Sequence, residues 1–393
     1  MGKEIELSTA ITDIAAGPFG SNLKVECFVP SGFPIIDGAN LKGYKVTDNI
    51  TKFVTEEKAR SLSRSIAHRG DVIVTISGTI GQIAYIPENS LYDEYLCSQR
   101  QFRVSFDSSM VYVPYLVFYF HTFEGQNKIL SFANQTGVPA LSQPLKNFKK
   151  IRLCLPSLQE QRRIARIVET INDKIENNIK INDNLQQQAA ALFADFYDRA
   201  ETEVGFTEII QILGGGTPKT GESSYWNGNV PFFTPKDVGS PYTLATEKTI
   251  TEEGLAHCNS RLYPINTVFV TARGTVGKVG LPGVPMAMNQ SCYALVGKDT
   301  HQLLVYFYTL KAVDRLKHKA SGAVFDAITT RDFESEIIMK LSDDDEKTFL
   351  DVAQPIYQAV LSNSIENLGL AALRDSLLPK LMSGEIDASA VQL

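Results

Sequence analysis

The sequence has little of what would attach a protein to a membrane or hold it together by disulfides. Its richest apolar stretch, Val111–Phe120, is well short of the roughly 20 residues that a membrane-spanning helix needs. The amino-terminal residues Met1–Glu4 lead into mixed polar sequence rather than the apolar segment of a signal peptide. The five cysteines are scattered and form no Cys-x-x-Cys pair, as is usual where thiols stay reduced. We therefore expect a cytoplasmic protein.

Motifs that carry chemistry are also missing. The segment Arg273–Val279 lacks the first glycine and the hydroxyl residue of a phosphate-binding loop, and its counterpart Ser77–Gln82 lacks the lysine as well. The Asn-Pro-Pro-Tyr/Phe motif of amino-methyltransferases is absent, and the five histidines show no metal-ligand spacing. These absences predict a chain with no active site, no metal and no cofactor of its own.

Length and composition indicate a folded protein of more than one domain. A chain of 393 residues is too long for one typical domain and suggests two or three. A hydrophobic content of 44% is ample for sizeable cores. The net charge of -6 neither indicates nor excludes DNA binding, because binding depends on where lysine and arginine cluster.

The chain contains an internal duplication. The segment Gly70–Gln82 matches Asn266–Lys278, with short parallels on either side of both. This spacing is far longer than the roughly 20 to 50 residues of a solenoid repeat, so it indicates a duplicated domain. Each copy predicts short strands bounded by turn signals such as Asn227-Gly228, and each repeated glycine segment predicts a strand followed by a turn. After these come a helical stretch (111–131 or 301–319), a glycine-containing loop, a last strand and a long helix.

Capping signals mark where the two long helices begin and end. Ser157 with Glu160 fits a capping box, and Ser342 with Asp345 is a weaker version. Gly384 is a plausible stop for the second helix. Pro355 lies within that helix and should kink it or displace its start.

Both long helices carry a 4-3 spacing typical of a coiled-coil seam. The first seam selects Ile164, Val168, Ile171, Ile175, Asn178, Asn182, Leu185, Ala189, Leu192 and Phe196. The second selects Phe349, Ala353, Ile356, Val360, Asn363, Asn367, Leu370, Arg374, Leu377 and Leu381. Both seams have asparagines at the same central positions, and buried asparagines usually fix register at a cost in stability.

Antiparallel pairing of the helices is favoured. It would place Asn178 near Asn367 and Asn182 near Asn363, and would put the two modules at opposite ends. Parallel pairing in register would align the asparagines too, and the helices could instead be two amphipathic helices packed on their own domains. In the paired arrangement, the run from Ile164 to Phe196 would be a spacer of roughly 50 Å.

The sequence resembles the specificity subunits of type I restriction–modification systems. Leu155–Ile164 resembles the segment that opens their spacer helix, and Leu377–Ile386 resembles the end of their second helix. Gly215–Pro218, Tyr225–Gly228 and Val230–Asp237 resemble the start of a target recognition domain. The first copy departs from this pattern, because Ala16–Ser21 replaces the Gly-Gly-Thr-Pro start and no tryptophan follows.

The resemblance implies a non-catalytic subunit that reads a bipartite, asymmetric site on double-stranded DNA, one part per recognition domain. It implies partners as well: two modification subunits that bind S-adenosylmethionine and methylate adenine, with restriction subunits as an optional addition. The alternatives are an enzyme with unfamiliar methyltransferase or nuclease motifs, and a scaffold protein that reads no DNA.

Residues expected to contact DNA are lysines and arginines suited to phosphates or guanine, amides suited to adenine, and hydroxyl-bearing residues beside them. In the first domain they are Lys24, Ser77, Gln99, Arg100, Gln135 and Thr136. In the second domain they are Lys219, Tyr225, Asn227, Lys236, Arg273, Asn289, Gln290, Lys317, Lys319 and Ser321. An ordinary solvated surface position is the alternative for each.

The expected fold class is α+β: two duplicated α/β target recognition domains, each a β-rich core with helices, separated by two long helices forming an antiparallel coiled coil. The expected domains are residues 1–155 and 201–341 for recognition, with 156–200 and 342–386 as spacer helices and 387–393 as a carboxyl-terminal tail.

Overall fold

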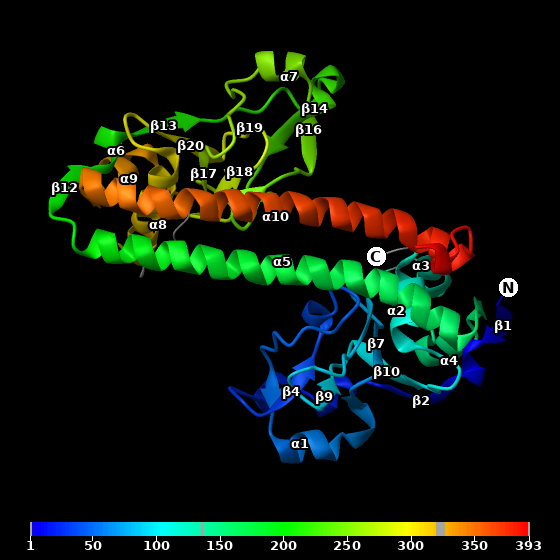
Figure 1. Cartoon of the computed structure of the whole chain (residues 1–393). Coiled ribbons are helices and arrows are strands. Elements are labelled where there is room, and N and C mark those ends of the chain that lie inside the picture. Colours follow the sequence, from blue (N-terminus) through cyan, green and yellow to red (C-terminus); the bar gives the residue numbers. More distant parts are fainter. Residues whose placement is uncertain (1, 135–136, 320–326, 392–393) are drawn as a thin grey trace. The chain divides into compact units, whose positions relative to one another are not determined.

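The computed structural model describes residues 2–134, 137–319 and 327–391 (Figure 1). Its contacts separate two compact units. Unit 1 comprises Met1–Asp173 and Leu370–Leu393, and unit 2 comprises Lys174–Gly369. Two long helices, α5 (Leu158–Asp198) and α10 (Asp343–Ser383), each contribute one part to each unit.

Unit 1 is a mixed unit of short strands and helices. Its strands are β1 (Lys3–Glu6), β2 (Ile11–Ala16), β3 (Phe28–Val29), β4 (Phe33–Ile36), β5 (Phe53–Val54), β6 (Ile66–His68), β7 (Val72–Thr75), β8 (Ile83–Tyr85), β9 (Glu94–Cys97), β10 (Gln101–Phe106) and β11 (Arg152–Leu155). Its shorter helices are α1 (Glu56–Ser61), α2 (Val113–His121), α3 (Phe123–Leu130) and α4 (Pro144–Lys149). The predicted helical stretch 111–131 divides because Thr122 is extended and its Oγ1 caps α3 by accepting from the Gly125 N–H at 3.1 Å.

Unit 2 has the same kinds of element in the same sequence. Its strands are β12 (Thr202–Gly205), β13 (Ile210–Gly214), β14 (Trp226–Phe233), β15 (Tyr242–Thr243), β16 (Lys248–Ile250), β17 (Val268–Thr271), β18 (Val279–Pro282), β19 (Ala287–Met288), β20 (Cys292–Gly297) and β21 (Ile337–Lys340). Its shorter helices are α6 (Phe206–Ile209), α7 (Glu252–Ala256), α8 (Gln302–Lys319) and α9 (Thr330–Glu334).

The sheets confirm the duplication. The order β2-β10-β7-β8 in unit 1 is repeated as β13-β20-β17-β18 in unit 2, where β15 adds a fifth strand. The registers coincide as well, because Gln101 pairs with Thr75 and Cys292 pairs with Thr271. In each unit an antiparallel strand pair, β1-β11 or β12-β21, joins the start of the copy to its end. The other sheets are β3-β5-β4-β9-β6 in unit 1 and β16-β14-β19 in unit 2.

The repeated glycine segments form turns, as predicted, between β7 and β8 and between β17 and β18. Gly78 and Gly81 have φ angles of +91° and +90°, and Gly274 and Gly277 have +83° and +73°. These are left-handed conformations that glycine adopts without steric cost. The sequence Asn227-Gly228 was expected to be a turn between strands, but it lies inside β14. There Asn227 has a φ of +61° and the pairing with β16 shifts register, so it forms an irregularity within the strand.

The ends of the long helices follow the predicted capping chemistry. Ser157 Oγ accepts from the Glu160 N–H at 3.3 Å, and Ser342 Oγ accepts from the Asp345 N–H at 3.2 Å. Gly384 follows the last residue of α10 with a φ of +77°. Pro355 does not displace the start of α10, because the helix begins at Asp343 and continues through the proline.

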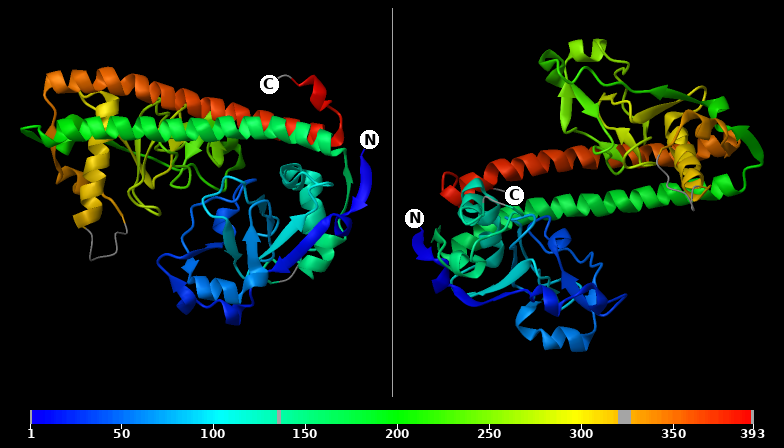
Figure 2. Two further views of the ribbon diagram at one scale, coloured as in Figure 1. Left: turned by 60° about the horizontal axis from the view of Figure 1, so that its bottom comes forward. Right: turned by 180° about the vertical axis from the view of Figure 1, so that it is seen from behind.

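The long helices pair antiparallel within unit 2, where they lie side by side in every view (Figures 1 and 2). Asn178 Nδ2 donates to Asn367 Oδ1 at 2.8 Å, and Asn363 Nδ2 donates to Asn182 Oδ1 at 2.8 Å. These are the pairs that antiparallel packing requires, so that arrangement is confirmed. Every seam position on both helices is buried or half-buried. Whether the asparagines set the register stays a prediction.

An aromatic cluster attaches the helices of unit 2 to the rest of that unit. Phe193 of α5, Phe307 of α8 and Phe349 of α10 are almost fully buried, with ring centroids 4.9 to 5.4 Å apart. Rings at these separations add to the burial of apolar area. In unit 1 a polar pair lies on the seam instead: Arg374 donates to Asn172 Oδ1 at 3.0 Å, with its guanidinium over the Tyr44 ring.

Candidate functional site

Three of the residues predicted to contact DNA line one cavity of unit 1. Ser77, Gln99 and Arg100 border a space of about 610 Å³, which we call the unit 1 cleft. Its walls are residues 35–39 after β4, residues 75–82 around the turn between β7 and β8, and residues 98–101 before β10. Lys24 is exposed between Leu23 and Val25, which also line the cleft.

Hydrogen bonds hold the two turns of the unit 1 cleft together. The Ile76 N–H donates to the Arg100 carbonyl at 2.6 Å, which joins the turn after β7 to the turn before β10. Gln99 Nε2 donates to the Leu23 carbonyl at 2.6 Å. The Gln99 amide nitrogen therefore fastens the segment that carries Lys24, whereas the Arg100 side chain is exposed at the rim.

Two amides line the floor of the unit 1 cleft, the half-buried Gln82 and the buried Gln101, and neither was predicted as a site residue from the sequence. Gln82 is satisfied by the protein: its Nε2 donates to the Gly38 carbonyl, and its Oε1 accepts from Thr75 Oγ1, both at 3.1 Å. Gln101 is only 1% exposed, and its Oε1 accepts from the Ser98 hydroxyl. The available signal was the duplication, because the position equivalent to Gln101 is the apolar Cys292.

Among the described residues that line the unit 1 cleft, Lys52 is held in an ion pair, whereas Arg100 forms none. Lys52 donates to Asp37 Oδ2 at 2.6 Å, so these two charges offset one another. Burial would raise the pKa of the Asp37 carboxyl, but hydrogen bonds from Lys52 and the Ala39 N–H outweigh it and lower that pKa. The Asp37 carboxylate is thus neutralised by Lys52. Arg100 at the rim therefore suits an anionic ligand.

The equivalent turns of unit 2 bring together Arg273, Asn289 and Gln290. The Ala272 N–H donates to the Ser291 carbonyl at 2.8 Å, and the Arg273 N–H does so at 3.3 Å. Asn289 Oδ1 accepts from the Ser291 N–H at 3.0 Å, which shapes the turn. Thr217 Oγ1 donates to Gln290 Oε1, so the loop after β13 joins this group. The side chains of Arg273 and Gln290 are exposed.

A second group of predicted residues surrounds Trp226. Trp226 Nε1 donates to the Lys219 carbonyl at 3.2 Å. The neighbouring Tyr225 ring stacks on His257 with centroids 5.1 Å apart, and Asn227 is exposed in the irregular part of β14. The stacking orients Tyr225, which is half-buried.

The remaining predicted residues of unit 2 that the structure describes are three lysines with different surroundings. Lys236 is exposed, 3.8 Å from Glu247. Lys317 borders a cavity of about 490 Å³ beside Gly277. Lys319 forms an ion pair with the buried Glu336, which Arg315 also contacts at 3.2 Å, so its ammonium is paired although the side chain is exposed. Gln135, Thr136 and Ser321 lie outside the described residues.

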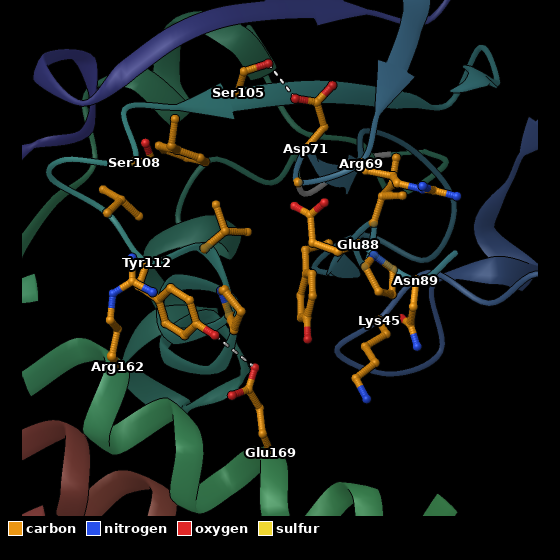
Figure 3. Close-up of a pocket in the computed structure, with 18 of the residues that line it drawn as sticks. Lys45, Arg69, Asp71, Glu88, Asn89, Ser105, Ser108, Tyr112, Arg162 and Glu169 are labelled. Atoms are coloured by element: carbon orange, nitrogen blue, oxygen red, sulfur yellow. Dashed lines mark hydrogen bonds between the residues drawn. The ribbon is translucent and has the colours of Figure 1, made fainter. Parts of the chain in front are cut away.

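Unit 1 has a further cavity of about 640 Å³ between its sheet and its part of α5 (Figure 3). On the helix side, the Tyr112 hydroxyl lies 3.5 Å from Glu169 Oε1, and the Arg162 guanidinium lies over the Tyr112 ring. On the sheet side, Ser105 Oγ donates to Asp71 Oδ1 at 2.5 Å. Burial and the nearby Asp173 raise the pKa of Glu169. The sequence analysis did not predict this cavity, whose lining comes from distant segments.

Two kinds of feature are absent from the described residues, a cluster of metal ligands and a membrane-spanning helix. In residues 2–134, 137–319 and 327–391, no three His, Cys, Asp or Glu side chains come together as metal ligands. No helix in the described part of the chain is long and apolar enough to cross a bilayer.

Comparisons with known proteins converge on one family. The family model described as "Type I restriction modification DNA specificity domain" matches residues 29–187 and 202–347. The type I restriction enzyme MjaIX specificity subunit of Methanocaldococcus jannaschii is 32% identical over 124 residues, which are 30% of this chain and 29% of that protein. The HindI specificity subunit of Haemophilus influenzae is 24% identical over 317 residues, covering 60% of this chain and 69% of that protein.

A solved structure shares the fold. The S subunit of a type I restriction–modification system from M. genitalium superposes with a TM-score of 0.59 at 14% identity, over 96% of this chain and 95% of that one. At this identity the likeness concerns the fold alone.

Proposed function

The chain belongs to the type I restriction–modification DNA specificity family, and on that premise we propose that it is a subunit that recognises a bipartite, asymmetric site on double-stranded DNA. Residues 1–155 and 201–341 are the two recognition domains, and each reads one part of the site. The observation that carries the proposal is that the family model matches the chain twice, once over each copy of the duplication.

The chemistry of the turns supports this proposal. Each unit presents an exposed arginine, Arg100 or Arg273, beside an amide-bearing turn. Arginine suits phosphates and guanine, and amides suit adenine. The glycines at positions 78 and 274 leave the backbone open for close approach. Lys24, Ser77, Gln99, Lys219, Tyr225, Asn227, Lys236, Asn289, Gln290 and Lys317 are the further proposed contacts.

The helical segments 156–200 and 342–386 are proposed as a spacer that also binds protein partners. Ile179, Ile181 and Ile365 lie in unit 2 on the paired helices and are 47% to 50% exposed. Apolar side chains left in water on a coiled coil favour a protein partner over a ligand of other chemistry. The proposed partners are two modification subunits that bind S-adenosylmethionine and methylate adenine, with restriction subunits as an optional addition.

The chain itself is proposed to be non-catalytic, with methylation carried out by the modification subunits. The test is to incubate the isolated chain with DNA and labelled S-adenosylmethionine. Label should reach the DNA only after the partner subunits are added. Appreciable transfer by the chain alone would favour the alternative of an unfamiliar methyltransferase.

The test of DNA recognition uses a tagged form of the chain. The chain is purified from the cells that naturally produce it, together with the proteins that bind it there. The complex is mixed with random-sequence duplex DNA at moderate salt, and the bound fraction is sequenced. A bipartite motif with a fixed gap is expected. Recovery of DNA with no motif would favour a scaffold that reads no sequence.

An arginine variant assigns one half of that motif to unit 2. Arg273→Ala should weaken binding by about 1–3 kcal/mol and relax one half of the motif while the other half stays intact. Arg199→Ala is the matched control, because Arg199 is also an exposed arginine of unit 2 but lies near Asp195 and Asp345 on the long helices. Arg199→Ala should leave both halves unchanged.

A further inference from the structure

Gln101 presents an unused hydrogen-bond donor to the unit 1 cleft. The residue is 1% exposed and lines the cleft floor. Its Oε1 accepts from Ser98 Oγ, and that hydroxyl also accepts from the Arg100 N–H at 3.4 Å, so the amide nitrogen is the end of the side chain that is turned away from Ser98. Among the described residues, none accepts a hydrogen bond from Gln101 Nε2.

Although the residue as a whole is 1% exposed, Gln101 Nε2 is not enclosed by protein atoms, so this donor opens to the cleft and is available to a ligand. The neighbouring Gln82 shows the ordinary solution, since both ends of its amide bond within the protein. Gln161 is equally buried in unit 1, and its amide nitrogen donates to the Met110 and Pro156 carbonyls, both at 3.0 Å. Gln101 thus differs from the half-buried Gln82 and from the buried Gln161, whose amide nitrogens both donate within the protein.

The backbone around Gln101 leaves room for an approaching group. Gly38 lies across from it, and a Cβ at Gly38 would stand 3.9 Å from Gln101 Nε2. The cleft of about 610 Å³ is wide enough for the edge of a nucleobase to approach the floor. Arg100 at the rim supplies the positive charge that a nucleic acid requires.

We propose that Gln101 determines which base the first recognition domain accepts at one position, by donating from Nε2 to an acceptor on the base edge. The inference rests on the proposed DNA-reading function and deepens it. In the major groove guanine, adenine and thymine present acceptors, whereas cytosine presents only its amino donor. The position read by Gln101 therefore excludes cytosine, because a donor would face a donor.

The second recognition domain lacks this reader. Cys292 occupies the equivalent register at the start of β20 and is fully buried. Burial raises the pKa of the Cys292 thiol to about 12, so the group stays protonated and is at most a weak donor. Unit 2 instead carries Arg273 at the position where unit 1 carries Ser77.

The test is Gln101→Met in the tagged complex, with the bound fraction of a random duplex library sequenced. Methionine keeps the length of the side chain and removes the donor. One position in one half of the motif should lose its exclusion of cytosine, by about tenfold. The other positions of that half and the whole of the other half should be unchanged.

Gln161→Met is the matched control, because it removes a buried amide that bonds only within the protein. It should lower thermal stability without changing the motif. If Gln101→Met lowers stability in the same way and leaves every position of the motif unchanged, the proposal is wrong. If the unaltered complex yields no motif at all, the DNA-reading function itself fails, which is a different outcome.

If the protein with Gln101→Met does not fold, a second substitution, Gly38→Ala, tests the same proposal. The added methyl group would narrow the approach to Gln101 Nε2, with Gln82 Oε1 at 3.2 Å as the tightest contact. The same position of the motif should weaken. An unchanged motif with Gly38→Ala, in a complex that still binds DNA, would overturn the assignment.

Discussion

Unit 1 and unit 2 share their strand order and register, yet they carry different chemistry at equivalent positions. Gln101 at the start of β10 stands where unit 2 has Cys292, and Ser77 in the turn between β7 and β8 stands where unit 2 has Arg273. The backbone pairing that places these residues is the same in both units. The fold therefore sets where side chains are presented and leaves their chemistry free.

The cavities next to the long helices show the same contrast. In unit 1, α5 contributes Glu169 and Asp173 to the cavity of about 640 Å³. Unit 2 has a cavity of about 290 Å³ beside α10, which contributes Gln354 and Gln358. Burial raises the pKa of Glu169, whereas burial lowers the pKa of His301 in the cavity of unit 2. One cavity is charged and the other is neutral, although both form between a sheet and a long helix of their own unit.

The largest expected effect comes from a buried carboxylate of unit 2 that has no counterpart at the equivalent position of unit 1. Glu336 is 1% exposed and pairs with Arg315 and Lys319, whereas the residue before β11 in unit 1 is Ile151. Glu336→Ala should cost unit 2 about 2–3 kcal/mol, reduced from the value for a fully buried pair because both cations are partly exposed. Trp226 is the one tryptophan and lies in unit 2, so its fluorescence during denaturation reports this unit.

Glu334→Ala is the control, because Glu334 is an exposed carboxylate on the adjoining helix α9. It should change the free energy of unfolding by less than about 0.5 kcal/mol. Equal effects of the two substitutions would mean that the buried charge contributes nothing specific to unit 2.

A smaller effect is expected from the asparagine layer, which lies in unit 2 alone. In Asn178→Leu with Asn367→Leu, both partners of one bond become apolar, so the free energy of unfolding should rise by about 1 kcal/mol. The helices should at the same time hold their register less strictly, seen as faster amide hydrogen exchange near residue 178. Strong destabilisation by the double change would contradict the role given to this layer.

The smallest effect tests the charged cavity of unit 1. A raised pKa means that folded Glu169 holds its proton more tightly than the unfolded chain does, so stability falls as the pH rises through that pKa. The substitution Glu169→Gln places in unit 1 the neutral side chain that unit 2 has at Gln354. It should remove the fall in stability with rising pH. The gain at neutral pH should be a few tenths of a kcal/mol and should vanish in mild acid.

The measurement is the melting temperature of Glu169→Gln as a function of pH. Glu88→Gln alters an exposed carboxylate of the same cavity and should leave the pH profile as it is. A profile for Glu169→Gln identical to that of the unaltered chain would mean that Glu169 is as well solvated in the folded protein as in the unfolded one.

Features built from neighbouring residues could be predicted well. The caps at Ser157 and Ser342, the turns at Gly78 and Gly274 and the pairing of the asparagines follow from local hydrogen bonding and helical period. The expectation for Asn227-Gly228 was wrong because a left-handed asparagine can sit within a strand as well as in a turn. Pro355 did not displace the start of α10, which begins at Asp343.

The sequence by itself therefore determined the two copies, their order of elements and the helix seams, since these depend on spacing along the chain. Only the tertiary structure decided what each polar side chain does. Gln101 is an open donor and Lys319 is held by Glu336 because of groups that fold against them from other segments. The two units thus differ where distant segments meet, and the period of the sequence carries no information about that.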